Sequence, residues 1–190
     1  MSATAADLEA LLAQRGALLE GHFRLSSGRH SDRFVQKFRL LEDPALVQAV
    51  AEAIAARFRE ERATVVAGAA VGGIVLAYEV AKQLGTRFVF VEKENGAPVL
   101  RRGFTVDSND RVLIVEDVVT TGLSVREVLG VVRASGADVI GAGVVIARAA
   151  IDLDVPVEAL LEMPLQSHEA SECPQCRDGV PITDPGSRRA

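Results

Sequence analysis

A regular alternation of short apolar segments with longer amphipathic ones restricts the fold of this chain more than any other feature. Strands are expected at 64–68, 87–91, 111–115, 139–147 and 156–161, and helices at 44–59, 73–84 and 124–134. Strands that alternate with helices predict βαβ units, and these build a mostly parallel sheet flanked by helices. The expected fold class is therefore α/β. The length of 190 residues suits a single domain.

Local signals support several of these boundaries. Asp43 and Pro44 are suited to the N-cap and first position of a helix, and Gly85 is suited to a helix end. Before this region, residues 4–15 have helical spacing, and residues 21–36 predict two short strands around a polar turn. The α/β core is expected at about 44–162, and smaller elements at about 16–40 and 163–190 form a hood.

Composition excludes several classes of protein. The net charge is −5 and no basic stripe occurs, which argues against a nucleic-acid partner. No apolar run reaches the roughly 18 residues that a membrane span needs, and the N-terminus lacks a signal-peptide pattern. We therefore expect a soluble, cytoplasmic protein that neither binds nor crosses a membrane.

One segment, residues 112–122, carries the main chemical signal. Four apolar residues predict a buried strand, two adjacent carboxylates (Glu116 and Asp117) mark its expected end, and Thr120-Thr121-Gly122 leads into the next helix. Backbone N–H groups, two hydroxyls and a helix N-terminus can hold a phosphate, while carboxylates accept hydrogen bonds from a sugar diol. A ribose 5-phosphate fits this combination. Walker-type and Gly-x-Gly-x-x-Gly nucleotide loops are absent.

The segment resembles the phosphoribosyl pyrophosphate (PRPP) signature of type I phosphoribosyltransferases. This resemblance implies that Glu116 and Asp117 hold the ribose hydroxyls and that the loop holds the 5-phosphate. The loop residues are Val118, Val119, Thr120, Thr121 and Gly122. It also implies a Mg²⁺ cofactor bridging pyrophosphate and ribose oxygens, with no protein side chain as metal ligand, and a homodimer. Asp117 is the expected electrostatic aid to catalysis.

A second glycine-containing turn is expected to approach the pyrophosphate. Residues 68–73 follow an expected strand, and Ala70, Val71 and Gly72 form the part closest to the substrate. Tight packing of a strand against a helix would explain the same glycines.

Upstream residues carry the resemblance to orotate phosphoribosyltransferases within this superfamily. The run from Leu25 to Ser31, with Phe34 and Gln36, is similar to the strand–turn–strand that packs over the base in that family. The resemblance implies that Arg29, Phe34, Thr121 and Arg148 contact orotate. A planar guanidinium suits a carboxylate, although each arginine could equally be a surface residue and Phe34 a core residue.

Departures from the family pattern keep other readings open. The commoner orotate enzymes carry lysine where Ser26 and Gly72 stand here. A phosphoribosyltransferase acting on a purine or uracil is one alternative. A non-enzymatic regulator that senses PRPP is another.

Residues 93–110 form an expected polar loop that could close over the site as a lid. Its cations Lys93, Arg101 and Arg102 could stabilise departing pyrophosphate, or could simply be solvated. Lys93 is the first choice as a catalytic residue, because the end of a strand positions it.

The two cysteines, Cys173 and Cys176, have the spacing of a metal knuckle. His168 is a conceivable third ligand, but a zinc site needs about four. Reduced thiols are therefore expected here rather than a structural zinc.

Overall fold

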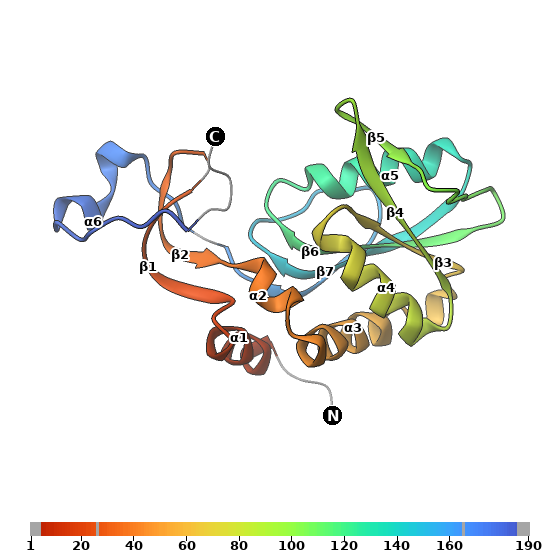
Figure 1. Ribbon diagram of the computed structural model, residues 1–190, viewed down its shortest axis with the longest axis horizontal. Coiled ribbons are helices and arrows are strands. Elements are labelled where there is room, and N and C mark those ends of the chain that lie inside the picture. Colours follow the sequence, from red (N-terminus) through yellow and green to blue (C-terminus); the bar gives the residue numbers. More distant parts are fainter. Residues whose placement is uncertain (1–4, 26, 165, 186–190) are drawn as a thin grey trace.

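A computed structural model describes residues 5–25, 27–164 and 166–185, and these form two parts of unequal size (Figure 1). The larger part contains a six-stranded sheet in the order β5-β4-β3-β6-β7-β8. Its strands are β3 (Val65–Ala69), β4 (Arg87–Glu94), β5 (Ala97–Leu100), β6 (Arg111–Val119), β7 (Asp138–Ala147) and β8 (Val157–Glu162). Every neighbouring pair is parallel except β4 and β5. The predicted α/β class is confirmed.

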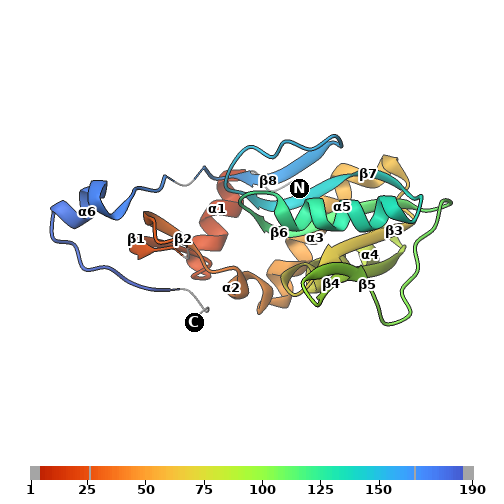
Figure 2. The same cartoon turned by 90° about the horizontal axis from the view of Figure 1, so that it is seen from above.

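Helices cover both faces of this sheet (Figure 2). The main helices are α1 (Ala5–Gln14), α3 (Pro44–Phe58), α4 (Gly72–Leu84) and α5 (Leu123–Ala134). Because side chains alternate along a strand, Leu113 packs toward α1, α3 and α4, whereas Ile114 packs toward α5. Both are essentially inaccessible to solvent. This double burial is why β6 reads as a continuous apolar run.

The helices expected at 44–59, 73–84 and 124–134 begin and end within one residue of the predicted positions. Capping groups set two of these ends. The carboxylate of Asp43 accepts hydrogen bonds from the N–H groups of Ala45 and Leu46, and Pro44 is the first helical residue of α3. Gly85 ends α4 in a left-handed conformation, with φ of 69°.

The strand order places a topological switch between β3 and β6. The chain passes from β3 outward to β4 on one side, and from β6 outward to β7 and β8 on the other. The turns that follow β3 and β6 therefore diverge, and a crevice opens between them at the carboxyl ends of the strands. Ligands bind at such points in open α/β sheets.

The expectation that β6 ends at Val115, just before the acid pair, is wrong. The strand continues to Val119, because β7 offers a pairing partner that far: Val118 pairs with Ile146, and Val119 with Ala147. Glu116 and Asp117 therefore belong to the strand, and successive side chains of a strand point to opposite faces. The turn itself is limited to residues 120–122.

The expected loop at 93–110 is also partly wrong. β4 runs to Glu94 and turns through Asn95 and Gly96, which have φ values of 51° and 85°, into the antiparallel strand β5. An Asn-Gly pair favours this two-residue hairpin turn, and it was the overlooked signal. Only residues 101–110 form an irregular connection, anchored by Phe104 between the rings of Phe88 and Phe90.

A smaller part lies at one end of the molecule, beyond the edge of α1 and α2 (Figure 2). It contains the antiparallel pair β1 (Leu18–Arg24) and β2 (His30–Val35), followed by the short helix α2 (Lys37–Leu41). The C-terminal segment lies against this hairpin: His168 pairs with His30, and Thr183 pairs with Phe23. It includes the 3-10 turn η2 (Ala170–Glu172) and the one-turn helix α6 (Pro174–Arg177). Another 3-10 turn, η1 (Arg59–Glu61), follows α3. Ser26 and residues 165 and 186–190 of the expected hood lie outside the described residues.

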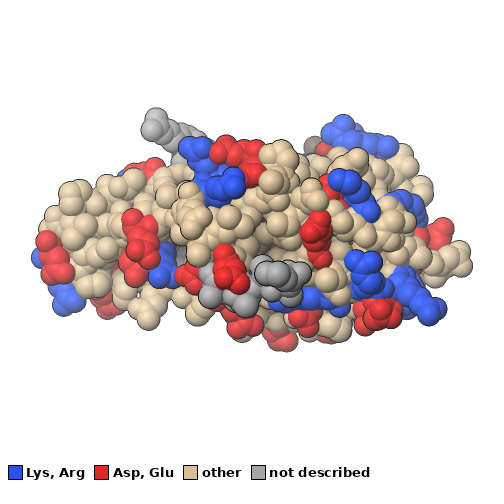
Figure 3. Space-filling model, turned by 90° about the horizontal axis from the view of Figure 1, so that it is seen from below, with Lys and Arg blue, Asp and Glu red and all other residues tan. Residues whose placement is uncertain are grey.

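Acidic and basic side chains are interspersed over the face shown in Figure 3. Among the described residues, no helix has both the length and the apolar composition that crossing a bilayer requires.

Gly68 is expected to be essential for packing α4 on β3. A Cβ at this position would overlap the carbonyl oxygen of Gly73 and lie 2.8 Å from its carbonyl carbon, both rigid backbone atoms. We expect Gly68→Ala to lower the free energy of unfolding by about 1–3 kcal/mol, measured by urea denaturation. Gly130, on the exposed face of α5 with no atom within 4 Å, is the control. Gly130→Ala should be neutral or stabilising by about 1 kcal/mol. Equal stability of the two variants would contradict this packing account.

Candidate functional site

A cavity of about 380 Å³ opens at the switch point between β3 and β6. Its lining comes from the turns after β3 and β6, the end of β4, and the first turns of α2 and α5. The lining residues are Lys37, Ala69, Ala70, Val91, Glu92, Lys93, Pro98, Val118, Thr120, Thr121, Leu123, Ser124, Glu127 and Val128. Of the sixteen site residues predicted from the sequence, five line this cavity: Ala70, Lys93, Val118, Thr120 and Thr121. The other eleven do not line it.

The turn after β6 has the features of an anion site. Gly122 adopts a left-handed conformation with φ of 75° and precedes the first residue of α5. In the described part of the chain, the N–H groups of Thr120, Thr121 and Gly122 donate no hydrogen bond. The hydroxyls of both threonines are exposed on the same turn. A helix N-terminus with free N–H groups attracts phosphate. Val119, by contrast, is buried in the core.

Glu116 and Asp117 are almost completely buried, with exposed fractions of 5% and 1%. They point to opposite faces of β6, so each carboxylate has different neighbours. Glu116 is held by the hydroxyl of Ser124 and by the N–H of Asp117. Burial, together with the charge of Asp117, raises the pKa of Glu116 from 4.5 to about 7. Glu116 therefore carries a proton for much of the time near neutral pH.

Asp117 has a cation as its neighbour. Its Oδ2 lies 3.2 Å from the ammonium of Lys37, and its Oδ1 accepts a hydrogen bond of 2.7 Å from the N–H of Val118. Oδ2 itself is buried and accepts no hydrogen bond from the described residues. A buried acceptor of this kind is costly, so it is a natural position for a donor or cation from a ligand.

The turn after β3 packs directly against Asp117. A Cβ on Gly72 would overlap the Asp117 carboxylate and lie 2.9 Å from the Lys37 ammonium. Only glycine leaves room for that ion pair. Ala70 lines the cavity, whereas the side chain of Val71 is largely exposed. The peptide bond between these two residues is cis.

Lys93 reaches the cavity, but the two arginines expected beside it do not. The ammonium of Lys93 lies 2.8 Å from a carboxylate oxygen of Glu127, and both residues line the cavity. Arg102 instead makes two hydrogen bonds of 3.0 Å to Glu92, and the pKa of Glu92 is lowered by this contact. Arg101 is paired with Glu94.

The residues expected to contact the base are dispersed. Arg29 is bound to the C-terminal segment, through Ser167 and Glu169. Phe34 packs against Phe23, away from the cavity. Arg148 follows β7, and it differs from the other two because its Nε is buried without a hydrogen-bond partner among the described residues. Burial lowers the pKa of Arg148, although an arginine stays charged at neutral pH. Thr121 lies in the cavity wall.

Lys37 is the functional residue that the sequence reasoning missed. It follows β2 by two positions and starts α2, a helix of only five residues that the spacing did not reveal. Its side chain spans from the small part of the molecule to the carboxylate of Asp117, 80 residues further along the chain. Its signal in the sequence was weak: a single lysine directly after the expected strand–turn–strand at 21–36.

Comparisons with known proteins agree with this geometry. A family model described as a phosphoribosyl transferase domain matches residues 39–156. An orotate phosphoribosyltransferase of Pelotomaculum thermopropionicum is 48% identical over 185 residues, covering 96% of this chain and 97% of the relative.

Solved structures show the same fold. The orotate phosphoribosyltransferase from Aeropyrum pernix has a TM-score of 0.70 at 28% identity, covering 82% of this chain and 93% of that chain. The adenine phosphoribosyltransferase from Rhodothermus marinus has a TM-score of 0.66 at 24% identity, covering 83% of this chain and 99% of that chain. The latter likeness concerns the fold alone. Because this chain is 48% identical to the Pelotomaculum relative over nearly its full length and matches the family model, it belongs to the orotate phosphoribosyltransferase family.

Proposed function

We propose that this protein transfers the ribose 5-phosphate group of PRPP to orotate, giving orotidine 5′-monophosphate and pyrophosphate in pyrimidine synthesis. The observation that carries the PRPP half is the cavity at the β3–β6 switch point. Its wall contains an open phosphate turn and two lysines, and a buried acid pair contacts residues of that wall from behind. The choice of orotate is supported by the relative that is 48% identical over nearly the whole chain.

The phosphate end of PRPP is assigned to the turn after β6. The free N–H groups of Thr120, Thr121 and Gly122 and the two hydroxyls would bind the 5-phosphate oxygens. The preceding strand is rigid, because it is paired on both sides. A rigid anchor fixes the ribose relative to the pyrophosphate end of the cavity.

The ribose hydroxyls are assigned to the acid pair. Neither carboxylate itself lines the cavity, but each contacts a residue that does: Asp117 contacts Lys37, and Glu116 contacts Ser124. Displacement of these side chains by the substrate would expose carboxylate oxygens to the hydroxyls.

The oxygen donors here also fit the Mg²⁺ that the family uses. Oδ2 of Asp117 is a buried hard ligand that is ion-paired with Lys37 but accepts no hydrogen bond from the described residues. The chemistry that a bound Mg²⁺ would supply here is neutralisation of charge on the pyrophosphate. Asp117 is the carboxylate that would face this ion, directly or through a substrate hydroxyl.

Departure of pyrophosphate makes the sugar carbon cationic and increases negative charge on the leaving group. Lys37 and Lys93 are the two ammonium groups in the cavity wall, and both would stabilise that charge as it develops. Each is at present paired with an acid and about half exposed, so each is free to move toward a ligand. Asp117 would stabilise the cationic sugar, and no covalent enzyme intermediate is needed.

The base is assigned to the neighbourhood of Arg148 and Thr121. A half-buried guanidinium with an unpartnered Nε suits the orotate carboxylate. Orotate contacts from Arg29 and Phe34 and pyrophosphate contacts from Arg101 and Arg102 stay predictions. These contacts require movement of the small part or of the β4–β5 hairpin. The cytoplasmic location is a separate prediction that also stays open to test.

A panel of bases tests this function. Purified protein with PRPP and Mg²⁺ should consume orotate, while uracil, adenine, guanine and xanthine should react at least 100-fold more slowly. Turnover of adenine but not of orotate would support the purine phosphoribosyltransferase instead. Tight PRPP binding without any turnover would select the regulator.

Two variants connect turnover with the cavity. Asp117→Asn should lower kcat/KM by about 100-fold or more, the size expected for loss of one charged group acting at the transition state. Asp138→Asn is the control, because Asp138 is exposed and pairs with Arg111 far from the cavity. Unchanged turnover in Asp117→Asn would contradict the assigned role.

Protonation of Glu116 predicts a pH effect on PRPP binding. Hydrogen bonds from ribose hydroxyls favour the ionised carboxylate, so binding near pH 7 should release protons from a group whose pKa is about 7. Calorimetry in two buffers of different ionisation enthalpy would measure this release, which should disappear in Glu116→Gln. Equal proton release in both proteins would refute the assignment.

The same shift sets the sign of a stability effect in the absence of ligand. Between about pH 4.5 and 7 the folded state holds a proton on Glu116 that the unfolded state has lost, so stability falls as pH rises through this window. The full effect is about 3 kcal/mol. Urea denaturation at pH 4.5 and 8 should show a smaller fall for Glu116→Gln than for the unsubstituted protein, and Glu158→Gln serves as the exposed control.

A homodimer is part of the proposal. Val71, Val75 and Tyr78 form an exposed apolar row at one to two turns' spacing along α4, and Phe38 on the adjacent α2 is exposed as well. Sedimentation equilibrium should give twice the chain mass of 20.2 kDa, and Tyr78→Glu should shift it toward one chain mass. A single-chain mass for the unsubstituted protein would contradict the dimer.

A further inference from the structure

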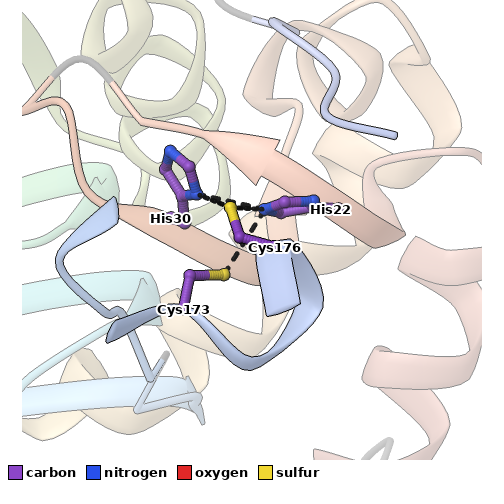
Figure 4. Close-up of side chains that lie close together, drawn as sticks. All are labelled: His22, His30, Cys173 and Cys176. Carbon is purple, nitrogen blue, oxygen red and sulfur yellow. Dashed lines mark hydrogen bonds between the residues drawn. The ribbon is translucent and has the colours of Figure 1, made fainter. Parts of the chain in front are cut away.

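Both cysteines of the chain and two of its three histidines converge in the small part of the molecule (Figure 4). His22 comes from β1 and His30 from β2, while Cys173 and Cys176 flank the start of α6. One potential ligand atom from each residue lies within 4.8 Å of all the others. His22, His30 and Cys173 are buried, and Cys176 closes the cluster from the solvent side.

The distances between these atoms match the edges of a tetrahedral site. Nε2 of His22 lies 3.1 Å from Nδ1 of His30, 3.4 Å from Sγ of Cys173 and 3.7 Å from Sγ of Cys176. Sγ of Cys176 lies 3.3 Å from Nδ1 of His30. Ligands on one Zn²⁺ would be about 3.3 Å (N to N) and about 3.6 Å (N to S) apart, given tetrahedral angles and usual bond lengths.

His22 is oriented as a metal ligand would be. Its Nδ1 lies 2.8 Å from the carbonyl oxygen of Val180, and only a protonated Nδ1 can donate to that oxygen. This tautomer leaves a lone pair on Nε2, the atom that faces the other three groups. One lone pair cannot accept from three donors at these distances, whereas one cation can bind all four atoms.

We propose that His22, His30, Cys173 and Cys176 bind one structural Zn²⁺ ion. Four nitrogen and sulfur ligands with no open position are typical of a structural rather than a catalytic zinc site. A Rieske-type cluster is disfavoured, because it places the cysteine pair and the histidine pair on different irons. Here each cysteine sulfur lies 3.3–3.4 Å from a histidine nitrogen.

Sequence spacing alone indicates too few ligands for this site. It offered His168 beside the cysteine pair, but His168 lies outside the cluster and only pairs its backbone with His30. The true partners are separated from Cys173 by 151 positions in the case of His22. The expectation of ordinary reduced thiols is therefore replaced by the present proposal.

The ion would connect the C-terminal segment to the β1–β2 hairpin. The small part buries few large apolar side chains of its own, and Phe23 is one of them. Small units with little core commonly depend on a metal or disulfide. The ordering of the hairpin matters for the cavity, since β2 leads within two residues to Lys37.

Metal analysis of the full-length protein tests the site. Protein purified without chelator should contain about one zinc per chain by mass spectrometry of the metal. Cys176→Ser and His30→Gln should lose most of it, whereas His168→Gln should keep it and serves as the matched control. Unsubstituted protein without bound zinc after incubation with a slight excess of zinc would overturn the proposal, as would full zinc content in Cys176→Ser.

A second measurement applies even if a variant fails to fold. Removal of the metal from the unsubstituted protein and addition of Co²⁺ should give the intense d–d bands of tetrahedral cobalt and a thiolate-to-cobalt charge-transfer band. Both thiols should react with a thiol reagent only after chelation. A disulfide between Cys173 and Cys176, or octahedral cobalt without a thiolate band, would refute the site. Neither readout depends on the transferase activity.

Discussion

The burial of two adjacent carboxylates near the end of β6 is the constraint around which the cavity is organised. An unpaired buried charge costs several kcal/mol, so both groups cannot stay ionised without partners. Strand alternation gives the two carboxylates different surroundings. On the α5 side, burial raises the pKa of Glu116 to about 7, and on the α4 side Asp117 pairs with Lys37. The two adjacent carboxylates thus have different neighbours because they face opposite sides of the sheet.

Much of the fold could be predicted because its signals are local. The Asp43-Pro44 helix start and the Gly85 helix end act within a few residues, and the apolar runs of β3, β6 and β7 report burial on both faces. The chemical segment at 112–122 was readable for the same reason. The length of β6 was not, since it depends on pairing with β7.

The parts of the site that were missed depend on contacts between distant segments. Lys37 is identified as a site residue only by its contact with Asp117, 80 positions further along the chain. His22 and His30 are identified as candidate ligands only by their contact with the cysteines of the C-terminal segment. Arg101 and Arg102 show the opposite case. Their charge and position near Lys93 indicated a phosphate site, but Glu94 and Glu92 on the same hairpin offer nearer partners.

Gly72 has a consequence for where positive charge can enter the cavity. The space above Asp117 is already filled by the Lys37 ammonium, because a Cβ on Gly72 would overlap the carboxylate and lie 2.9 Å from that ammonium. The cation beside Asp117 therefore comes from α2, which follows the peripheral hairpin, whereas Lys93 comes from strand β4 of the sheet. Because this ion pair joins α2 to strand β6, a shift of the peripheral hairpin away from the sheet would separate the Lys37 ammonium from Asp117 and remove a positive charge from the cavity wall.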